Sequence, residues 1–143
     1  GRAAIAGQSP EAVREIESAM TIHTAVGGFH IVLENGEPAG RRGVRAARSA
    51  IGVDEEGRRA VILAVGGDSP GASVGLTTKE VGEWLESLGA YDALLLDGGG
   101  STSLAVRESH DEGSEVRMTI TPSWGPLLGV ERPVANLLAV RRK

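Results

Sequence analysis

A run of glycines between an apolar segment and three hydroxyl residues constrains this chain more than any other feature. It reads Ala93-Leu-Leu-Leu-Asp97-Gly-Gly-Gly-Ser-Thr-Ser103. Consecutive glycines allow positive φ angles and leave their backbone N–H groups uncovered by side chains. Successive N–H groups with hydroxyls beside them form a concavity suited to an anion such as phosphate. The segment therefore predicts a short buried strand that ends in an anion-binding turn with Asp97 at its rim. A plain flexible turn between two strands is the alternative.

Turn residues and hydrophobic periodicity predict more strands than helices in the rest of the chain. One helix begins at Ser9-Pro10, and another begins at the capping box Thr77-Thr-Lys-Glu80 and ends at Gly89. Strands are expected at 29–33, 49–53, 58–65, 92–96, 104–106, 116–120 and 136–140. Only one strand–helix–strand unit is evident. We therefore expect an α+β fold with a mixed, largely antiparallel β-sheet core and two or more packed helices.

The hydrophobic pattern also predicts which faces are buried. Both faces of the strand at 58–65 are apolar, so we expect it to be covered on both sides. In the second helix, the apolar residues at helical spacing predict one buried face; they are Val81, Trp84, Leu85 and Leu88. The turn at Asn35-Gly36 follows a strand, and residues 37–47 are expected to form a loop.

Composition narrows the classes of function. The 143 residues fit one domain, and a net charge of −4 with 3% aromatic residues argues against a nucleic-acid-binding protein. The absence of cysteine excludes disulfides and thiolate metal sites. No apolar run is long enough to predict a membrane span. His23, His30 and His110 lack metal-like spacing, so neither a metal nor a cofactor is predicted.

Several segments together resemble the phosphodiester glycosidase family. The most specific is Ser73-Val-Gly-Leu-Thr77-Thr-Lys-Glu80, followed by a helix and by Asp92 to Thr102. Arg48-Ser-Ala-Ile-Gly-Val53 and Glu131-Arg132-Pro-Val-Ala-Asn136 are similar to two further family motifs. The resemblance runs from about residue 28 to residue 140. It implies a hydrolase that cleaves the glycosidic bond of a sugar-1-phosphodiester, outside the cytoplasm, in a cell-surface polymer or glycoconjugate.

The resemblance also implies roles for individual residues. Asp97, Arg48 and Glu80 are the candidate catalytic residues. The candidate substrate- and phosphate-binding residues are Gly98, Gly99, Gly100, Ser101, Thr102, Arg132, Asn136, Asp68 and Thr77. Cleavage of a sugar–phosphate bond collects negative charge on the departing phosphate, so arginines and N–H donors suit the site. Ordinary structural roles are the alternatives: a strand-end arginine for Arg48 and a helix cap for Glu80.

The chain departs from the family pattern in places. It has Val65-Gly66-Gly67-Asp68 where relatives usually have Val-Asp-Gly-Arg. An acid and an arginine are therefore missing or displaced. Relatives also carry N-terminal strands, so residues 1–143 are predicted to be a single domain that lacks them. Sheet edges left unpaired in this way can be covered by a partner chain or by a homo-oligomer.

Two other functions compete with the hydrolase. A catalytically impaired module that binds phosphoglycans or assists assembly would keep the anion pocket without turnover. Asp-x-Gly-Gly-Gly-Ser/Thr hairpins also bind phosphate in actin-like kinases and exopolyphosphatases. Here, however, no residue separates Asp97 from Gly98, and 143 residues are too few for the two lobes of those enzymes.

Overall fold

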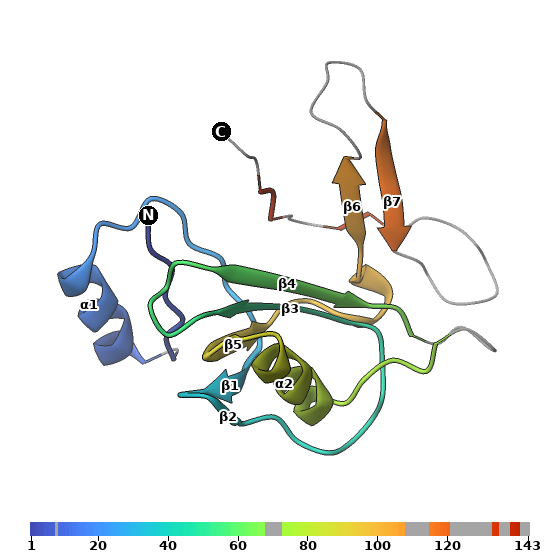
Figure 1. Cartoon of the computed structure of the whole chain (residues 1–143), viewed down its shortest axis with the longest axis horizontal. Coiled ribbons are helices and arrows are strands. Elements are labelled where there is room, and N and C mark those ends of the chain that lie inside the picture. Colours follow the sequence, from blue (N-terminus) through green and yellow to red (C-terminus); the bar gives the residue numbers. More distant parts are fainter. Residues whose placement is uncertain (8, 68–72, 108–114, 121–132, 135–137, 141–143) are drawn as a thin grey trace.

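The computed structural model describes residues 1–7, 9–67, 73–107, 115–120, 133–134 and 138–140 (Figure 1). The strands are β1 (His30–Glu34), β2 (Glu37–Pro38), β3 (Arg48–Val53), β4 (Ala60–Val65), β5 (Asp92–Leu95), β6 (Leu104–Arg107) and β7 (Val116–Ile120). The α-helices are α1 (Pro10–Ala19) and α2 (Thr78–Ser87), and a 3-10 turn spans Gly99–Ser101. The structure therefore confirms the predicted α+β class.

Five strands form the main sheet in the order β2-β1-β5-β3-β4, and every neighbouring pair is antiparallel. Because β4 and β5 are both antiparallel to β3, they run parallel to each other. The connection between them is the crossover that contains α2, as expected for parallel strands. β6 and β7 form a separate antiparallel hairpin that projects from the main sheet (Figure 1).

Local sequence signals determine where the helices and the first turn begin and end. The Ser9 side chain accepts a hydrogen bond from the Ala12 N–H, which caps α1. Asn35 and Gly36 take φ angles of 52° and 77° in the turn between β1 and β2. Thr77 and Glu80 form the predicted capping box of α2. The predicted starts of both helices and the Asn-Gly turn are therefore confirmed.

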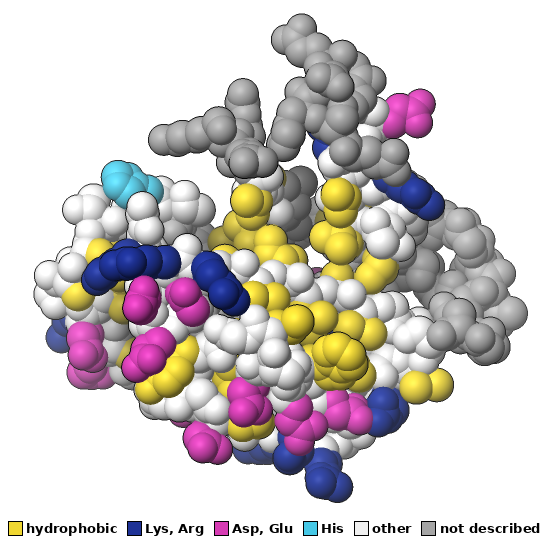
Figure 2. Space-filling view, in the orientation of Figure 1, with side chains coloured by type: hydrophobic (Ala, Val, Ile, Leu, Met, Phe, Trp, Pro, Cys, Tyr) yellow, Lys and Arg dark blue, Asp and Glu magenta, His cyan; other side chains and the backbone are white. Residues whose placement is uncertain are grey.

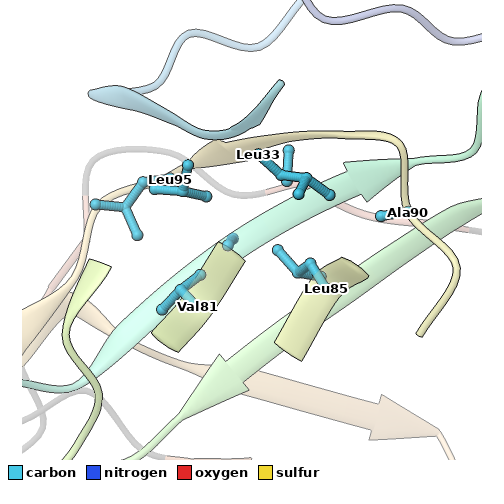
Figure 3. Packing of buried hydrophobic residues seen from close by; sticks show 8 residues of the cluster. Leu33, Val81, Leu85, Ala90 and Leu95 are labelled. Carbon is cyan, nitrogen blue, oxygen red and sulfur yellow. The ribbon is translucent and has the colours of Figure 1, made fainter. Parts of the chain in front are cut away.

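The core lies between α2 and one face of the sheet. α2 packs against β1, β2, β3 and β5. Figure 3 shows Val81 and Leu85 of the helix beside Leu33 and Leu95 of the sheet, with Ala90 close by. These side chains are buried, and their removal from water stabilises the fold. The helix therefore holds β1, β5 and β3 together at the place where the candidate site begins.

Four burial or strand predictions are wrong. Residues 37 and 38, which were predicted to lie in a loop, form the short strand β2. No residue of β4 is buried, and Ile62 is 44% exposed, because β4 lies at an edge of the sheet. Trp84 is 55% exposed, so only part of the predicted apolar face of α2 meets the sheet. Figure 2 shows hydrophobic side chains gathered over β4 and α2. Residues 138–140 form no strand, and residues 136 and 137 lie outside the described residues.

We expect Leu85→Ala to lower the free energy of unfolding by about 3 kcal/mol, because it leaves a cavity under α2. Leu88→Ala is the matched control, because Leu88 is 44% exposed and lies at the end of the same helix. Its expected cost is below about 1 kcal/mol. Urea unfolding followed by circular dichroism measures both variants. Equal losses would contradict the packing described above.

Candidate active site

The pairing of β3 with β5 brings Arg48 and Asp97 together. Ala50 pairs with Leu95, and the ladder continues because the Leu96 N–H donates to the Ser49 carbonyl over 2.8 Å. Two residues beyond the pair of Ala50 and Leu95, Arg48 lies opposite Asp97 in the register. The Asp97 side chain lies in an exposed position just after β5. The register therefore sets an aspartate and an arginine opposite each other at one end of the sheet.

The glycine turn is folded back against β3. The Gly99 N–H donates to the Ala47 carbonyl over 2.8 Å, with a φ of 57° at Gly99. The Gly98 N–H donates to Oδ1 of Asp97 over 2.9 Å. The N–H groups of Ser101 and Thr102 donate to carbonyls within the turn.

The predicted row of open donors is therefore not formed. Over Gly98–Thr102, the donors without a partner among the described residues are the Gly100 N–H and the hydroxyls of Ser101 and Thr102. Because glycine is flexible, the turn can fold so that most of its N–H groups bond within the protein. The sequence alone does not distinguish this closed turn from one whose N–H groups are open to an anion.

Thr102 is buried rather than exposed at this turn. It is 2% exposed, and its Oγ1 has no hydrogen-bond partner in the described part of the chain. A buried hydroxyl without a partner costs about 1–3 kcal/mol. A ligand can reach this oxygen only if the group that covers it moves. Ser101 is the more accessible of the two adjacent hydroxyl residues.

Arg48 joins two segments and keeps some of its donors free. Its Nε donates to the Leu76 carbonyl and its Nη2 to the Val44 carbonyl, each over 3.0 Å. These bonds fix the guanidinium beside the loop that leads into α2. Nη1 has no recorded partner among the described residues, so it can donate to a ligand. Arg48 is therefore both a structural link and a candidate anion contact.

Glu80 bonds to Thr77 and to Arg45, an arginine that the sequence did not single out as a site residue. The Thr77 N–H and hydroxyl each donate to Oε2 of Glu80 over 2.9 Å. The Glu80 N–H donates to the Thr77 hydroxyl, and Arg45 forms an ion pair with the same carboxylate. Arg45 also donates to the Gly75 carbonyl over 3.1 Å. In this arrangement both predicted site residues serve the helix cap.

The pKa of Glu80 lies below its ordinary value of 4.5, chiefly because the Thr77 N–H donates to the carboxylate. Desolvation opposes this shift, and the Thr77 hydroxyl and the Arg45 charge lower the pKa further. The Glu80 carboxylate is thus ionised, and its oxygens already bond to Thr77 and Arg45. It is poorly suited to act as a proton donor near neutral pH.

Three of the predicted site residues, Asp68, Arg132 and Asn136, lie outside the described residues, as does His110. In the part of the chain that the structure describes, no group of three His, Cys, Asp or Glu side chains could hold a metal ion. None of the described helices is both long and apolar enough to cross a membrane.

The lowered pKa of Glu80 makes a prediction about stability and pH. The folded state favours the carboxylate, so the contribution of Glu80 is complete above pH 4.5 and is lost as the pH falls through the lower folded pKa. We expect Glu80→Gln to lower the melting temperature at pH 7, and we expect this deficit to be smaller near pH 3. Glu86→Gln is the control, because the exposed Glu86 side chain makes no recorded bond. A deficit of equal size at both pH values would contradict this role.

The chain was compared with known proteins. A sequence model described as phosphodiester glycosidase matches residues 2–141. No curated protein matches. One similar solved structure is a zebrafish N-acetylglucosamine-1-phosphodiester alpha-N-acetylglucosaminidase catalytic domain described as auto-inhibited by its pro-peptide. It is 25% identical with a TM-score of 0.47, and the match covers 55% of this chain and 31% of that one.

Another similar structure is that of a hypothetical protein from Synechocystis, with 34% identity and a TM-score of 0.42. This match covers 56% of this chain and 16% of that one. The aligned region is therefore about a third or less of either solved chain. The family model, in contrast, spans almost the whole sequence, including the glycine turn and Arg48. The chain belongs to the phosphodiester glycosidase family.

Proposed function

We propose that this chain is a hydrolase that cleaves the glycosidic bond of a sugar-1-phosphodiester resembling an N-acetylglucosamine-1-phosphodiester. The bond between the anomeric carbon and the phosphate oxygen breaks, water supplies the new anomeric hydroxyl, and a phosphomonoester leaves. The observation that carries the proposal is the register that brings the exposed Asp97 opposite Arg48 at the end of β3 and β5. Membership of the family supports the same reaction.

Asp97 is the group that acts at the anomeric carbon. One of its oxygens accepts the Gly98 N–H, which orients the carboxylate, and the other makes no recorded bond among the described residues. The transition state for this cleavage resembles an oxocarbenium ion, which a carboxylate stabilises. A carboxylate in that position serves as nucleophile, general base or electrostatic stabiliser, and all three roles require its charge.

The phosphate is held on the β3 side of Asp97. Nη1 of Arg48, the Gly100 N–H and the Ser101 hydroxyl are the donors available there. Charge-assisted bonds from a guanidinium suit the negative charge that develops on a departing phosphate. Glu80 acts in this proposal as a positioning residue, because it fixes the start of α2 and the Arg45 segment beside Arg48.

Further parts of the proposal concern the setting of the reaction. We infer that the substrate belongs to a cell-surface polymer or glycoconjugate and that the chain works outside the cytoplasm. We also infer that residues 1–143 form a single domain. β4 pairs only with β3 within the described residues, so a partner chain or second copy along this edge is part of the proposal.

Asp97→Asn tests the reaction. We expect it to reduce release of N-acetylglucosamine from a methyl N-acetylglucosamine-1-phosphodiester by about a hundredfold or more, because the charge at the anomeric carbon is lost. Asn keeps an oxygen that can accept the Gly98 N–H, so the circular dichroism spectrum and melting temperature should stay the same. Product release is measured by chromatography.

Asp92→Asn is the matched control, because it makes the same change at the opposite end of β5. Its Oδ1 accepts the Asn35 N–H over 2.9 Å, a bond that Asn can also accept. Full activity in the Asp97 variant, or equal losses of activity in both variants, would contradict the catalytic role of Asp97. If the wild-type protein binds phosphorylated glycans and releases no sugar from any of a panel of diesters, a binding module is the correct function.

A further inference from the structure

A hollow of about 310 Å³ lies at the start of β1 and of α2 and is not used by the function proposed so far. Three residues of β1, three residues that follow β2 and the first residue of α2 line it. Its side chains able to bind a ligand by charge or hydrogen bond are His30, Arg41 and Thr78, and no lining residue is acidic. The hollow therefore offers positive charge without a carboxylate to neutralise it.

The wall of the hollow is fixed by bonds between the main chain at Arg41 and the start of α2. The Arg41 N–H donates to Oγ1 of Thr78 over 2.9 Å, and that hydroxyl donates back to the Arg41 carbonyl over 3.0 Å. The Lys79 N–H donates to the same carbonyl over 3.1 Å. At Gly40, a Cβ would lie 2.2 Å from the Thr78 carbonyl oxygen, so only glycine fits this approach. The wall is held by the Arg41 main chain, the Thr78 hydroxyl and the Lys79 N–H, and the Arg41 side chain remains available.

The hollow adjoins the site across β5. His30 pairs with Leu95, two residues before Asp97. Side chains of directly paired residues lie on the same face of a sheet. Leu95 belongs to the core under α2, so His30 lies on that face as well. The strand order β3-β5-β1 therefore sets Arg48, Asp97 and His30 in sequence across the end of the sheet.

The charges around the hollow favour an anion. Arg45 and Arg48 already bond to protein groups. The guanidinium of Arg41 and the imidazole of His30 have no partner among the described residues. A guanidinium presents paired donors that match a phosphate or carboxylate group. An anionic group is therefore the ligand whose chemistry fits this lining.

We propose that the hollow binds a second phosphate group of the substrate, attached to the sugar whose anomeric bond is cleaved. This inference rests on the proposed function, in which the scissile phosphate lies at Arg48 and the sugar lies at Asp97. The next position in the same direction is His30, so the second phosphate belongs to the sugar side of the broken bond. Such a phosphate is either a monoester on that sugar or the next diester of a sugar-phosphate polymer.

The test compares three substrates that share the same methyl phosphodiester on N-acetylglucosamine. The first carries no further charge, the second a phosphate monoester on the sugar, and the third a methyl phosphodiester at the same hydroxyl. We expect wild-type kcat/KM to be roughly tenfold higher for at least one charged substrate, as suits one charge-assisted contact. A preference for the second indicates a monoester, and a preference for the third indicates a polymer.

Arg41→Gln should remove this preference and leave kcat/KM for the uncharged substrate unchanged, because the bonds of Arg41 to Thr78 use only its main chain. Arg42→Gln is the control, because Arg42 is exposed and does not line the hollow. Wild-type cleavage of all three substrates at equal rates would overturn the subsite and leave the proposed function intact. Cleavage of none would overturn the proposed function.

Binding gives a second measurement that does not need turnover. The three compounds are titrated calorimetrically into the Asp97→Asn protein with and without Arg41→Gln. We expect the Arg41 change to weaken only the charged compounds, by roughly tenfold. Equal affinities for all three compounds, or equal losses caused by Arg41→Gln and Arg42→Gln, would overturn the subsite whatever the outcome of the kinetic measurement.

Discussion

The antiparallel pairing of β3 with β5 is the constraint on which the rest of the structure depends. It sets Ala50 against Leu95 under α2, which completes the core. The same register, continued past the end of β5, sets Arg48 opposite Asp97. A shift of one residue would turn every side chain of β5 to the other face. Such a shift would break the core and the candidate site together, so the stability of the sheet also holds the site in register.

The features predictable from the sequence are those determined by local interactions. The capping box at Thr77, the proline-initiated helix at Ser9 and the Asn35-Gly36 turn each depend on residues within a few positions of one another. The strand that ends at the glycine run was also predictable, because its apolar residues are contiguous. These signals were sufficient for the α+β class and for the position of Asp97.

The features that could not be predicted depend on contacts between distant segments. Arg48 bonds to the carbonyls of Val44 and Leu76, and no local sequence pattern predicts either partner. Arg45 meets Glu80 across 35 positions of sequence. The Gly99 N–H finds the Ala47 carbonyl, which closes the cradle that three glycines suggested. In each case a donor that looked available in the sequence is satisfied by tertiary structure.

These long-range bonds change how the site must work. Two donors of the Arg48 guanidinium already bond to carbonyls, so its position is fixed before a phosphate binds. Binding therefore costs less side-chain conformational entropy. The same bonds leave fewer Arg48 donors free, and a phosphate group accepts several hydrogen bonds. Few positively charged donors remain near Arg48, so a second arginine is useful for binding an anionic substrate. Arg41 can fill this role, because its backbone is held by hydrogen bonds and its side chain has no partner among the described residues. Recognition of a second anionic group can then supply binding energy away from the bond that breaks, where it orients the sugar over Asp97.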